Sequence, residues 1–336
     1  MKAAIIENHG GPETVRLMEG FPDPKPAPGE VVLKVAATAL NYHDIFTRNG
    51  MPGIAVPMPM IMGIDIAGTV TELGEGVEGF RVGDRVLVDP MIRTVRGGLI
   101  GEMRHGGLAE FCCVPADQLL PLPEDVSLEQ AAALPVAYGT AHRMMVTHGQ
   151  IKPGERVLIL GASGGVGTCC VQLAKMLGAE VIACASTEDK LERLKALGSD
   201  HVINYTRADF TKTIWEMFGK PARRTFDGGV DVVVNYTGGD TWVKSLRAMK
   251  RGGRMLTCGA TAGYDPAEDI RYIWTFELKI LGSNGWTRDD LKALVELVRT
   301  KKIDPVIDTV LPLERARDAI ALIEDRKVFG KVLVKP

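Results

Sequence analysis

A glycine-rich segment near the middle of the chain has the composition of a phosphate-binding loop. It follows the apolar run 157–160 and contains, in order, Gly161, Ser163, Gly164, Gly165, Val166 and Gly167. The first glycine permits a tight turn, the middle pair leaves room for a pyrophosphate, and the last lets a helix pack close to a sheet. Free N–H groups and the dipole at the helix start favour an anion. The segment therefore predicts a dinucleotide site, and a glycine-rich turn without a ligand is the alternative.

The end of the next predicted strand, residues 180–185, indicates which dinucleotide is bound. Enzymes that prefer NAD place an Asp or Glu there to bind the ribose hydroxyls. This chain instead has the small, hydroxylic Ser186, and the basic side chain of Lys190 one helical turn later could reach a 2′-phosphate. Glu188 and Asp189 mildly favour NAD, although carboxylates also stabilise the start of a helix whatever cofactor is bound. The pattern predicts NADPH rather than NADH.

Two kinds of structure must position these residues. Up to about residue 125, short apolar runs alternate with Gly and Pro, which is typical of a mainly β domain. From residue 127 onward, predicted strands and helices alternate strictly, which builds a parallel, doubly wound sheet. The predicted fold class is therefore α/β. We expect a catalytic domain at 1–126, a dinucleotide-binding domain at 127–284, and a return to the catalytic domain at 285–336.

Length, charge and cysteine spacing exclude several classes of protein. A chain of 336 residues exceeds a single typical core, so two domains are expected. The net charge of −2 offers no basic excess for a phosphate backbone, so no nucleic-acid partner is expected. Apolar runs are interrupted well before membrane-spanning length, and no signal-peptide core follows the N-terminus. The six cysteines lack Cys-x-x-Cys spacing, which indicates reduced, mostly buried thiols in a cytoplasmic protein.

Six segments together carry a resemblance to a known family. They are residues 39–44, 74–86, 131–135, 161–167, 202–205 and 282–283. On these motifs the chain resembles, over essentially its whole length, the medium-chain dehydrogenase/reductase superfamily, and more closely its quinone reductase and enoyl reductase branch. The resemblance implies a GroES-like β domain joined to a Rossmann domain, with the active site in the cleft between them. It also implies a homodimer, formed through the sheet edge near 278–281.

The resemblance assigns cofactor contacts to particular residues. In NADPH-using relatives, the residues that match Ser186, Lys190 and Tyr205 hold the 2′-phosphate. Arg326 matches a further arginine found in some members, and Thr140 matches a threonine beside the nicotinamide. The predicted cofactor contacts that remain, beyond the glycine-rich loop, are Gly259 and Ser283.

Zinc-dependent members of the superfamily carry ligands that this chain lacks. Asn41 stands where they have a cysteine, and Ile64-Asp65 where they have His-Glu. Neither an amide nor an aliphatic side chain is a good zinc ligand, so a tetrahedral catalytic site cannot be assembled. The four-cysteine structural lobe is also missing, since residues 91–98 contain no cysteine. No metal is therefore predicted, and a different metal held by His43 and Asp65 is the alternative.

The missing zinc ligands narrow the predicted chemistry. Zinc would polarise a carbonyl and stabilise an alkoxide, so interconversion of alcohols and ketones becomes less favoured without it. Reduction of an activated C=C bond in an enone or enoyl thioester, or of a quinone, needs less stabilisation of the developing negative charge, because conjugation spreads that charge. We therefore predict an NADPH-dependent oxidoreductase that transfers a hydride to a small-molecule acceptor of this kind. The alternatives are a zinc-independent alcohol dehydrogenase or ketone/aldehyde reductase, and a protein that binds NADPH without turnover.

The source of the proton is a separate question. His43 stands where zinc-dependent relatives have the hydroxyl of their proton relay, so it could act as an acid near neutral pH. The rest of the predicted catalytic set consists of Asn41, Tyr42 and Tyr138. Solvent is a further source of the proton. The alternative for His43 is a hydrogen-bonded histidine paired with Asp44 or Asp65.

Three arginines lie in the segment that replaces the zinc lobe or directly after it. They are Arg93, Arg96 and Arg104. Their positive charges could receive an acidic or phosphorylated acceptor such as a CoA thioester, and a solvated loop is the alternative.

Overall fold

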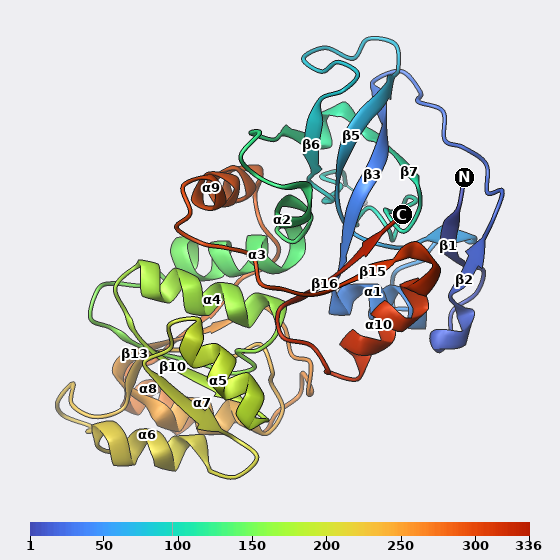
Figure 1. The fold of residues 1–336 in the computed structure, drawn as a ribbon. Coiled ribbons are helices and arrows are strands. Elements are labelled where there is room, and N and C mark those ends of the chain that lie inside the picture. The colour runs from blue at the N-terminus through green and yellow to red at the C-terminus, as the bar shows by residue number, and fades with distance from the viewer. Residues whose placement is uncertain (96) are drawn as a thin grey trace. The chain divides into compact units, whose positions relative to one another are not determined.

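A computed structural model describes residues 1–95 and 97–336, and it divides the chain into two compact units (Figure 1). The first unit comprises Met1–Ala137 and Leu291–Pro336, and the second comprises Tyr138–Asp290. The sequence placed the two domain boundaries earlier, at 126/127 and 284/285. The difference at the first boundary has a physical reason, because helix α2 (Leu128–Ala132) packs against strands of the first unit.

The first unit contains two β-sheets. The smaller sheet is antiparallel and has the strand order β2-β1-β4. The larger sheet has the order β15-β16-β3-β5-β6-β8, and β7 also pairs with β3. The strands are β1 (Ala3–Ile6), β2 (Arg16–Met18), β3 (Glu30–Leu40), β4 (Met60–Ile61), β5 (Asp65–Leu73), β6 (Arg85–Val88), β7 (Phe111–Pro115), β8 (Leu119–Pro121), β15 (Ile307–Pro312) and β16 (Lys331–Lys335). The mainly β character predicted for this part of the chain is confirmed.

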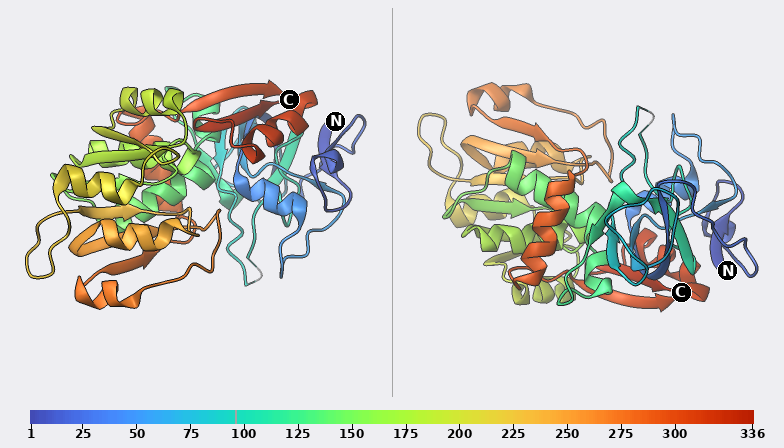
Figure 2. Two further views of the ribbon diagram at one scale, coloured as in Figure 1. Left: turned by 90° about the horizontal axis from the view of Figure 1, so that it is seen from below. Right: turned by 90° about the horizontal axis from the view of Figure 1, so that it is seen from above.

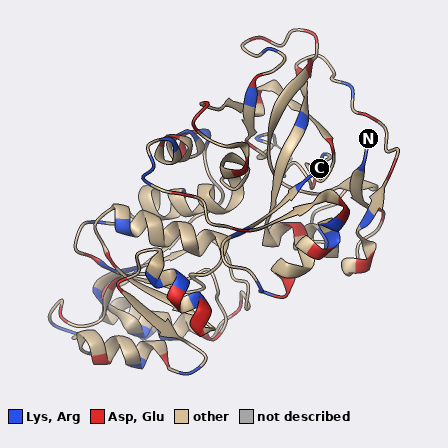
Figure 3. Cartoon of the chain, in the orientation of Figure 1, with Lys and Arg blue, Asp and Glu red and all other residues tan. Residues whose placement is uncertain are grey.

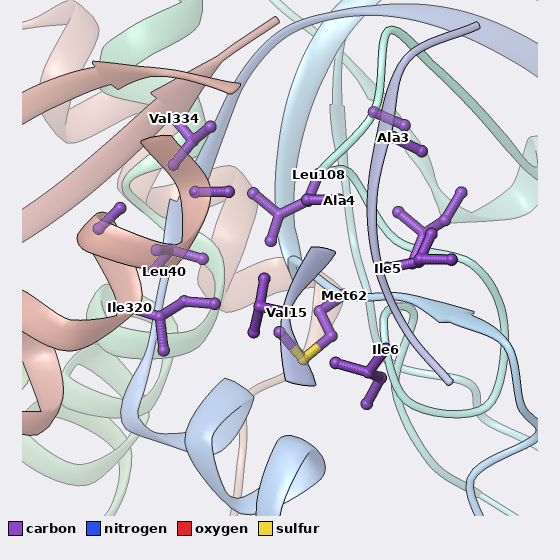
Figure 4. Packing of buried hydrophobic residues seen from close by; sticks show 14 of the residues in the cluster. Ala3, Ala4, Ile5, Ile6, Val15, Leu40, Met62, Leu108, Ile320 and Val334 are labelled. Carbon is purple, nitrogen blue, oxygen red and sulfur yellow. The ribbon is translucent and has the colours of Figure 1, made fainter. Parts of the chain in front are cut away.

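Helices from both ends of the chain pack on this β unit. They are α1 (Tyr42–Asn49), α2 and α10 (Ala316–Glu324). Two further helices, α3 (Pro135–His142) and α9 (Arg288–Arg299), contain the points in the sequence at which one unit ends and the other begins. One buried apolar cluster joins β1, β3, α10 and β16, and it includes Ile5, Leu40, Ile320 and Val334 (Figure 4). The C-terminal segment therefore completes the core that the N-terminal segment begins, as the predicted return to the first domain requires.

The second unit is a parallel sheet with helices on both sides (Figure 2). Its strand order is β11-β10-β9-β12-β13-β14, and every pair of neighbours is parallel. The elements are β9 (Arg156–Ile159), α4 (Gly165–Met176), β10 (Glu180–Ala185), α5 (Glu188–Ala196), β11 (His201–Asn204), α6 (Phe210–Phe218), β12 (Val230–Val234), α7 (Thr241–Ala248), β13 (Met249–Thr257), α8 (Ile270–Thr275) and β14 (Lys279–Gly282). The order reverses at β9, so loops that follow β9 and β12 lie at the switch point where dinucleotides bind in such sheets. The predicted Rossmann-type fold is confirmed.

Among the described residues, no helix is both long enough and apolar enough to cross a membrane. Acidic and basic residues alternate along the chain in both units (Figure 3).

Candidate functional site

The glycine-rich loop occupies the carboxyl end of β9 in the second unit. Gly161 has a φ of +62°, which glycine adopts without strain, and Gly164 directly precedes helix α4. A Cβ at Gly167 would lie 2.5 Å from the Cα of Ala162, so only glycine allows this close approach of helix and loop. The structure therefore brings the predicted loop residues together at a helix start, where backbone N–H groups favour a pyrophosphate.

A tyrosine that sequence reasoning missed supports this loop. The Tyr236 hydroxyl donates a hydrogen bond of 2.7 Å to the carbonyl of Gly161. Burial raises the pKa of Tyr236 well above its usual range, so the hydroxyl keeps its proton and remains a donor. Tyr236 lies two residues after β12, next to β9 in the sheet. Only that strand order, which local sequence patterns do not specify, relates the two segments.

The predicted 2′-phosphate contacts lie together at the ends of two neighbouring strands. Ser186 directly follows β10, and Lys190 lies in the first turn of α5. The backbone N–H of Tyr205 donates to the carbonyl of Ala185 (3.2 Å), which holds the end of β11 against the end of β10. By contrast, Arg326 belongs to the first unit, where it follows α10, and its predicted cofactor contact stays a prediction.

The remaining predicted cofactor contacts come from three further segments of the second unit. Thr140 lies on α3, Gly259 follows β13, and Ser283 follows β14. The side-chain oxygen of Ser283 is buried and has no hydrogen-bond partner within the described chain. Because protein atoms enclose this oxygen, the side chain as placed does not reach a ligand, and the predicted cofactor contact of Ser283 stays a prediction. The glycine-rich loop, with its close approach to the helix start, is the feature that suits a dinucleotide.

In the first unit, His43 forms an ion pair with a residue that the sequence did not indicate. The distance from His43 Nε2 to Glu102 Oε2 is 2.5 Å. The Glu102 side chain is 3% exposed and the His43 side chain 26% exposed, so the histidine remains accessible while its partner is buried. The expected partners Asp44 and Asp65 are instead bound elsewhere. Glu102 lies 59 positions from His43 in the sequence, and no local motif connects them.

The electrostatics of this pair favour a protonated histidine. Burial disfavours the charged form, but the hydrogen bond and charge of Glu102, together with the charge of Asp44, outweigh it and raise the pKa of His43. Burial raises the pKa of Asp44 to about 6, against the hydrogen bond that it accepts from the N–H of Asn41. Asp44 also accepts a bond of 3.1 Å from the N–H of Gly63, so it fixes the start of helix α1.

A buried lysine, Lys331, contacts two residues of the motifs that carry the zinc ligands in zinc-dependent relatives. Lys331 Nζ donates to Asn41 Oδ1 (2.5 Å) and to the backbone carbonyl of Leu40 (3.0 Å), and it lies 3.1 Å from Asp65 Oδ2. The Asn41 amide donates to the same carboxylate oxygen of Asp65 (2.9 Å). The side chains of Lys331 and Asp65 are 2% and 0% exposed.

The network around Lys331 occupies side chains that a zinc site at these positions would need as ligands. The amide of Asn41 and the carboxylate of Asp65 are committed to an internal cation, and the side chain of Ile64 offers no ligand. The residues at these positions therefore do not suit the tetrahedral site of zinc-dependent relatives. Among the described residues, no group of three or more His, Cys, Asp or Glu side chains is arranged to hold a metal ion.

The two tyrosines of the predicted catalytic set differ in position. Tyr42 is the first residue of α1 and is partly exposed, with its ring against Phe46 at a centroid distance of 5.2 Å. Tyr138 belongs to the second unit and is fully buried, with its hydroxyl 3.4 Å from Gln172 Nε2. A fully buried hydroxyl does not reach an acceptor, so the structure favours Tyr42 over Tyr138 as a rival to His43.

The arginines expected to bind an acidic acceptor already have carboxylate partners. Arg93 lies 2.5 Å from the buried Asp89, and Arg104 lies 2.5 Å from Glu30. Arg96 lies outside the described residues. Because the two described arginines support their own loops, the interpretation of this segment as an acceptor-binding cluster is not favoured.

Comparison with known proteins identifies the class. The alcohol dehydrogenase GroES-like domain family matches residues 27–124, and the family described as zinc-binding dehydrogenase matches residues 165–300. An acryloyl-coenzyme A reductase of Sulfurisphaera tokodaii is 33% identical, with all of both chains covered. A solved structure described as an NAD-dependent alcohol dehydrogenase is 37% identical, with a TM-score of 0.91 and all of both chains covered.

A further solved structure contains both a nucleotide and a thioester. It is a 2-octenoyl-CoA carboxylase reductase in complex with NADP and 2-octenoyl-CoA, 30% identical, with a TM-score of 0.85 over 96% of this chain and 82% of that one. With a relative 33% identical over its whole length, the chain belongs to the medium-chain dehydrogenase/reductase superfamily. It is therefore an oxidoreductase, and the family and the GroES-like plus Rossmann architecture predicted from its motifs are confirmed.

Proposed function

We propose that this protein is an NADPH-dependent reductase of activated C=C bonds, with enoyl thioesters as its preferred class of acceptor. One observation carries the proposal. Asn41 and Asp65, which stand in the motifs that carry the zinc ligands in alcohol dehydrogenases of the superfamily, form a buried network with Lys331 instead of a site for a Lewis acid that would polarise a simple carbonyl. A conjugated acceptor needs less stabilisation by the protein, because its own conjugation disperses the charge that develops on hydride transfer.

The names of similar proteins support the same acceptor class. The relative from Sulfurisphaera tokodaii is an acryloyl-coenzyme A reductase, and the carboxylase reductase structure contains 2-octenoyl-CoA. Both names denote reduction of an enoyl thioester. The structure described as an NAD-dependent alcohol dehydrogenase favours the alternative, which is a ketone or aldehyde reductase that uses this chain's own side chains in place of zinc.

The preference for NADPH rests on the second unit. Ser186, Lys190 and Tyr205 lie at adjoining strand ends, where a 2′-phosphate is placed in NADPH-dependent Rossmann domains. The bound nicotinamide supplies the hydride. The glycine-rich loop at the start of α4 is proposed to orient the pyrophosphate of the cofactor.

In the first unit, His43 is proposed to hold the proton that the reduced acceptor needs. Hydride transfer to the β carbon of an enoyl thioester leaves an enolate, and protonation at the α carbon completes the reduction. Glu102 fixes the imidazole through Nε2 and raises its pKa, so the protonated form persists to higher pH than in a histidine without this partner. The exposed part of the His43 ring leaves room for the acceptor, whereas Glu102 is buried and acts only through the histidine.

The molecule's setting is part of the proposal. We expect a homodimer that forms through strand β14, and we expect the cytoplasm as the compartment. All six cysteines are free, and burial raises the pKa of each thiol, as suits a protein of a reducing compartment.

The test is consumption of NADPH by EDTA-treated protein with a matched panel of acceptors: crotonyl-CoA, an enone, the corresponding saturated ketone and a quinone, with NADH in parallel. The expected result is turnover of crotonyl-CoA that survives EDTA and exceeds turnover of the saturated ketone by at least roughly a hundredfold. Equal or faster reduction of the saturated ketone would establish the alternative. Loss of activity with EDTA, restored by zinc, would contradict the argument from the Lys331 network.

A further inference from the structure

We infer that Arg207 determines cofactor preference by neutralising Glu188 at the rim of the 2′-phosphate site. The inference rests on the proposed use of NADPH and concerns a residue that neither the motifs nor the family resemblance indicated. Its basis is an ion pair and a hydrogen-bonded turn within the second unit, at the adjoining ends of β10 and β11.

The carboxylate of Glu188 has two partners at the end of β11 and in the turn that follows it. Its Oε1 atom accepts a hydrogen bond of 2.7 Å from the Asn204 side-chain amide and lies 3.1 Å from Nη1 of Arg207. Glu188 is the first residue of α5 and directly follows the pair Ser186-Thr187, whereas Asn204 is the last residue of β11. The carboxylate therefore bridges the two strand ends.

The turn after β11 fixes both partners of this carboxylate. The N–H of Arg207 donates to the carbonyl of Asn204 (3.1 Å), which turns the chain back on itself. The side-chain oxygen of Asn204 accepts hydrogen bonds from the hydroxyl (2.7 Å) and the N–H (3.1 Å) of Thr206. Because its oxygen is engaged there, the Asn204 amide nitrogen is oriented toward Glu188. Tyr205, a predicted 2′-phosphate contact, lies in the same turn.

The position of Glu188 explains why its charge needs a partner. A carboxylate near the end of this strand binds ribose hydroxyls in NAD-dependent enzymes and repels the dianionic 2′-phosphate of NADPH. Two positions later on the same helix lies Lys190, which is proposed to contact that phosphate. Figure 3 shows acidic and basic residues side by side on α5. Arg207 cancels the unfavourable charge and adds a guanidinium at the rim, so both effects favour the phosphate.

Both side chains are largely exposed, at 72% for Arg207 and 58% for Glu188, so their contribution is to ligand selection rather than to folding. Substitution of Arg207 leaves a net negative charge beside the phosphate site. We expect Arg207→Ala to weaken NADPH binding by roughly fivefold to tenfold while NADH binding changes less than about twofold. The effect should shrink at high ionic strength, since solvent-exposed charges are screened.

The experiment is calorimetric binding of NADPH, NADH, 2′,5′-ADP and 5′-AMP to the full chain and to five variants. The variants are R207A, E188Q, the double variant E188Q/R207A, K190A, and K195A as a control for loss of a positive charge elsewhere on α5. The expected result is weaker binding of NADPH and 2′,5′-ADP by R207A, restored at least in part by E188Q/R207A, while binding of NADH and 5′-AMP changes less than about twofold. K195A should behave as the unsubstituted protein.

Binding needs no acceptor, so the outcome does not depend on the identity of the reaction. If the unsubstituted protein prefers NADPH and K190A loses that preference while R207A keeps it, the inference about Arg207 is wrong and the proposed cofactor stands. If R207A and K195A weaken NADPH binding equally, the effect is one of net charge and the inference is again wrong. If the unsubstituted protein binds NADH as tightly as NADPH, the proposed cofactor itself is wrong, and the inference falls with it.

Discussion

Among single side chains, His43 and Glu102 have the most direct bearing on the proposed reaction. The acid that protonates the enolate must carry a proton at working pH, and Glu102 raises the pKa of His43 by accepting its hydrogen bond. In Glu102→Gln this charge is removed, so the pKa of His43 should fall. Because the protonated histidine is the active form, kcat falls as the pH rises through this pKa. In the variant this fall should therefore begin at a lower pH than in the unsubstituted protein. We expect a roughly tenfold loss of kcat near neutral pH, measured as the pH profile of kcat with crotonyl-CoA.

Two variants separate this role from a structural one. Glu30→Gln removes a carboxylate that pairs with Arg104 in the same unit, and it should leave the pH profile in place. His43→Asn should lose the pH-dependent limb altogether. If His43→Asn retains full kcat at every pH, solvent supplies the proton and the proposed role of the pair is contradicted.

The sequence predicted residues of this site unevenly. Asn41 and His43 were identifiable because they lie in one motif, and the loop from Gly161 to Gly167 because its residues are consecutive. Glu102 and Lys331 were not identifiable, since they reach the motif from 59 and 290 positions away. A Lys in a terminal strand and a Glu in a loop are ordinary surface residues by composition, and only the tertiary fold buries them.

The pairing of β16 with β3 shows how one element depends on a buried charge. Strand β16 brings Lys331 to the end of β3 and beside Asp65 at the start of β5. In Lys331→Met the ammonium is lost, while the carboxylate of Asp65 remains buried. Removing one partner of a buried pair costs about 3–5 kcal/mol. We expect a loss of this size in the free energy of unfolding, measured by urea denaturation.

A double variant tests whether the unpaired charge is the cause. Asp65→Asn in the Lys331→Met background removes the stranded carboxylate, so part of the lost stability should return. If the double variant is no more stable than Lys331→Met, the loss arises from packing around β16 rather than from the buried charge.

Helix α4 and its preceding loop give a second prediction at the level of elements. In Gly167→Ala the new Cβ would meet the backbone of Ala162 at 2.5 Å, so helix and loop must separate. Overpacking of this kind costs about 1–3 kcal/mol and should also weaken NADPH binding. At Gly164 the nearest atom to a new Cβ is 3.6 Å away, so Gly164→Ala should fold normally and lose only cofactor affinity. Thermal unfolding and NADPH titration of both variants distinguish the two effects.

The elements themselves were predictable to different degrees. Alternating strands and helices in the second unit follow from local hydrophobic patterns, and so does the parallel sheet that they form. The pairing of the short strand β4 with β1, and of β16 with β3, joins segments distant in sequence, for which no local pattern exists. Helix α2 was assigned to the second domain because of its helical pattern, yet its packing places it in the first unit.

For the whole molecule, the proposed dimer depends on the exposed edge of the second unit's sheet. Among the described residues, β14 is the last strand of this sheet and pairs with β13 on one side. Its residue Ile280 is 37% exposed. An exposed sheet edge is a template for pairing with a second copy, and a two-fold axis would place the same residue twice at the interface. In Ile280→Asp two carboxylates would then meet there, so we expect the dimer to dissociate.

The measurement is molar mass by light scattering during size-exclusion chromatography, with a chain mass of 36.3 kDa as the reference. Val310→Asp is the matched control, because Val310 is an exposed apolar residue on β15, the terminal strand of the other large sheet. The unsubstituted protein and Val310→Asp should elute with twice the chain mass, and Ile280→Asp with the mass of one chain. If Val310→Asp dissociates and Ile280→Asp does not, the copies meet through the first unit. A single-chain mass for the unsubstituted protein would show that β14 is left uncovered in solution, and the charged substitution there should then change neither mass nor activity.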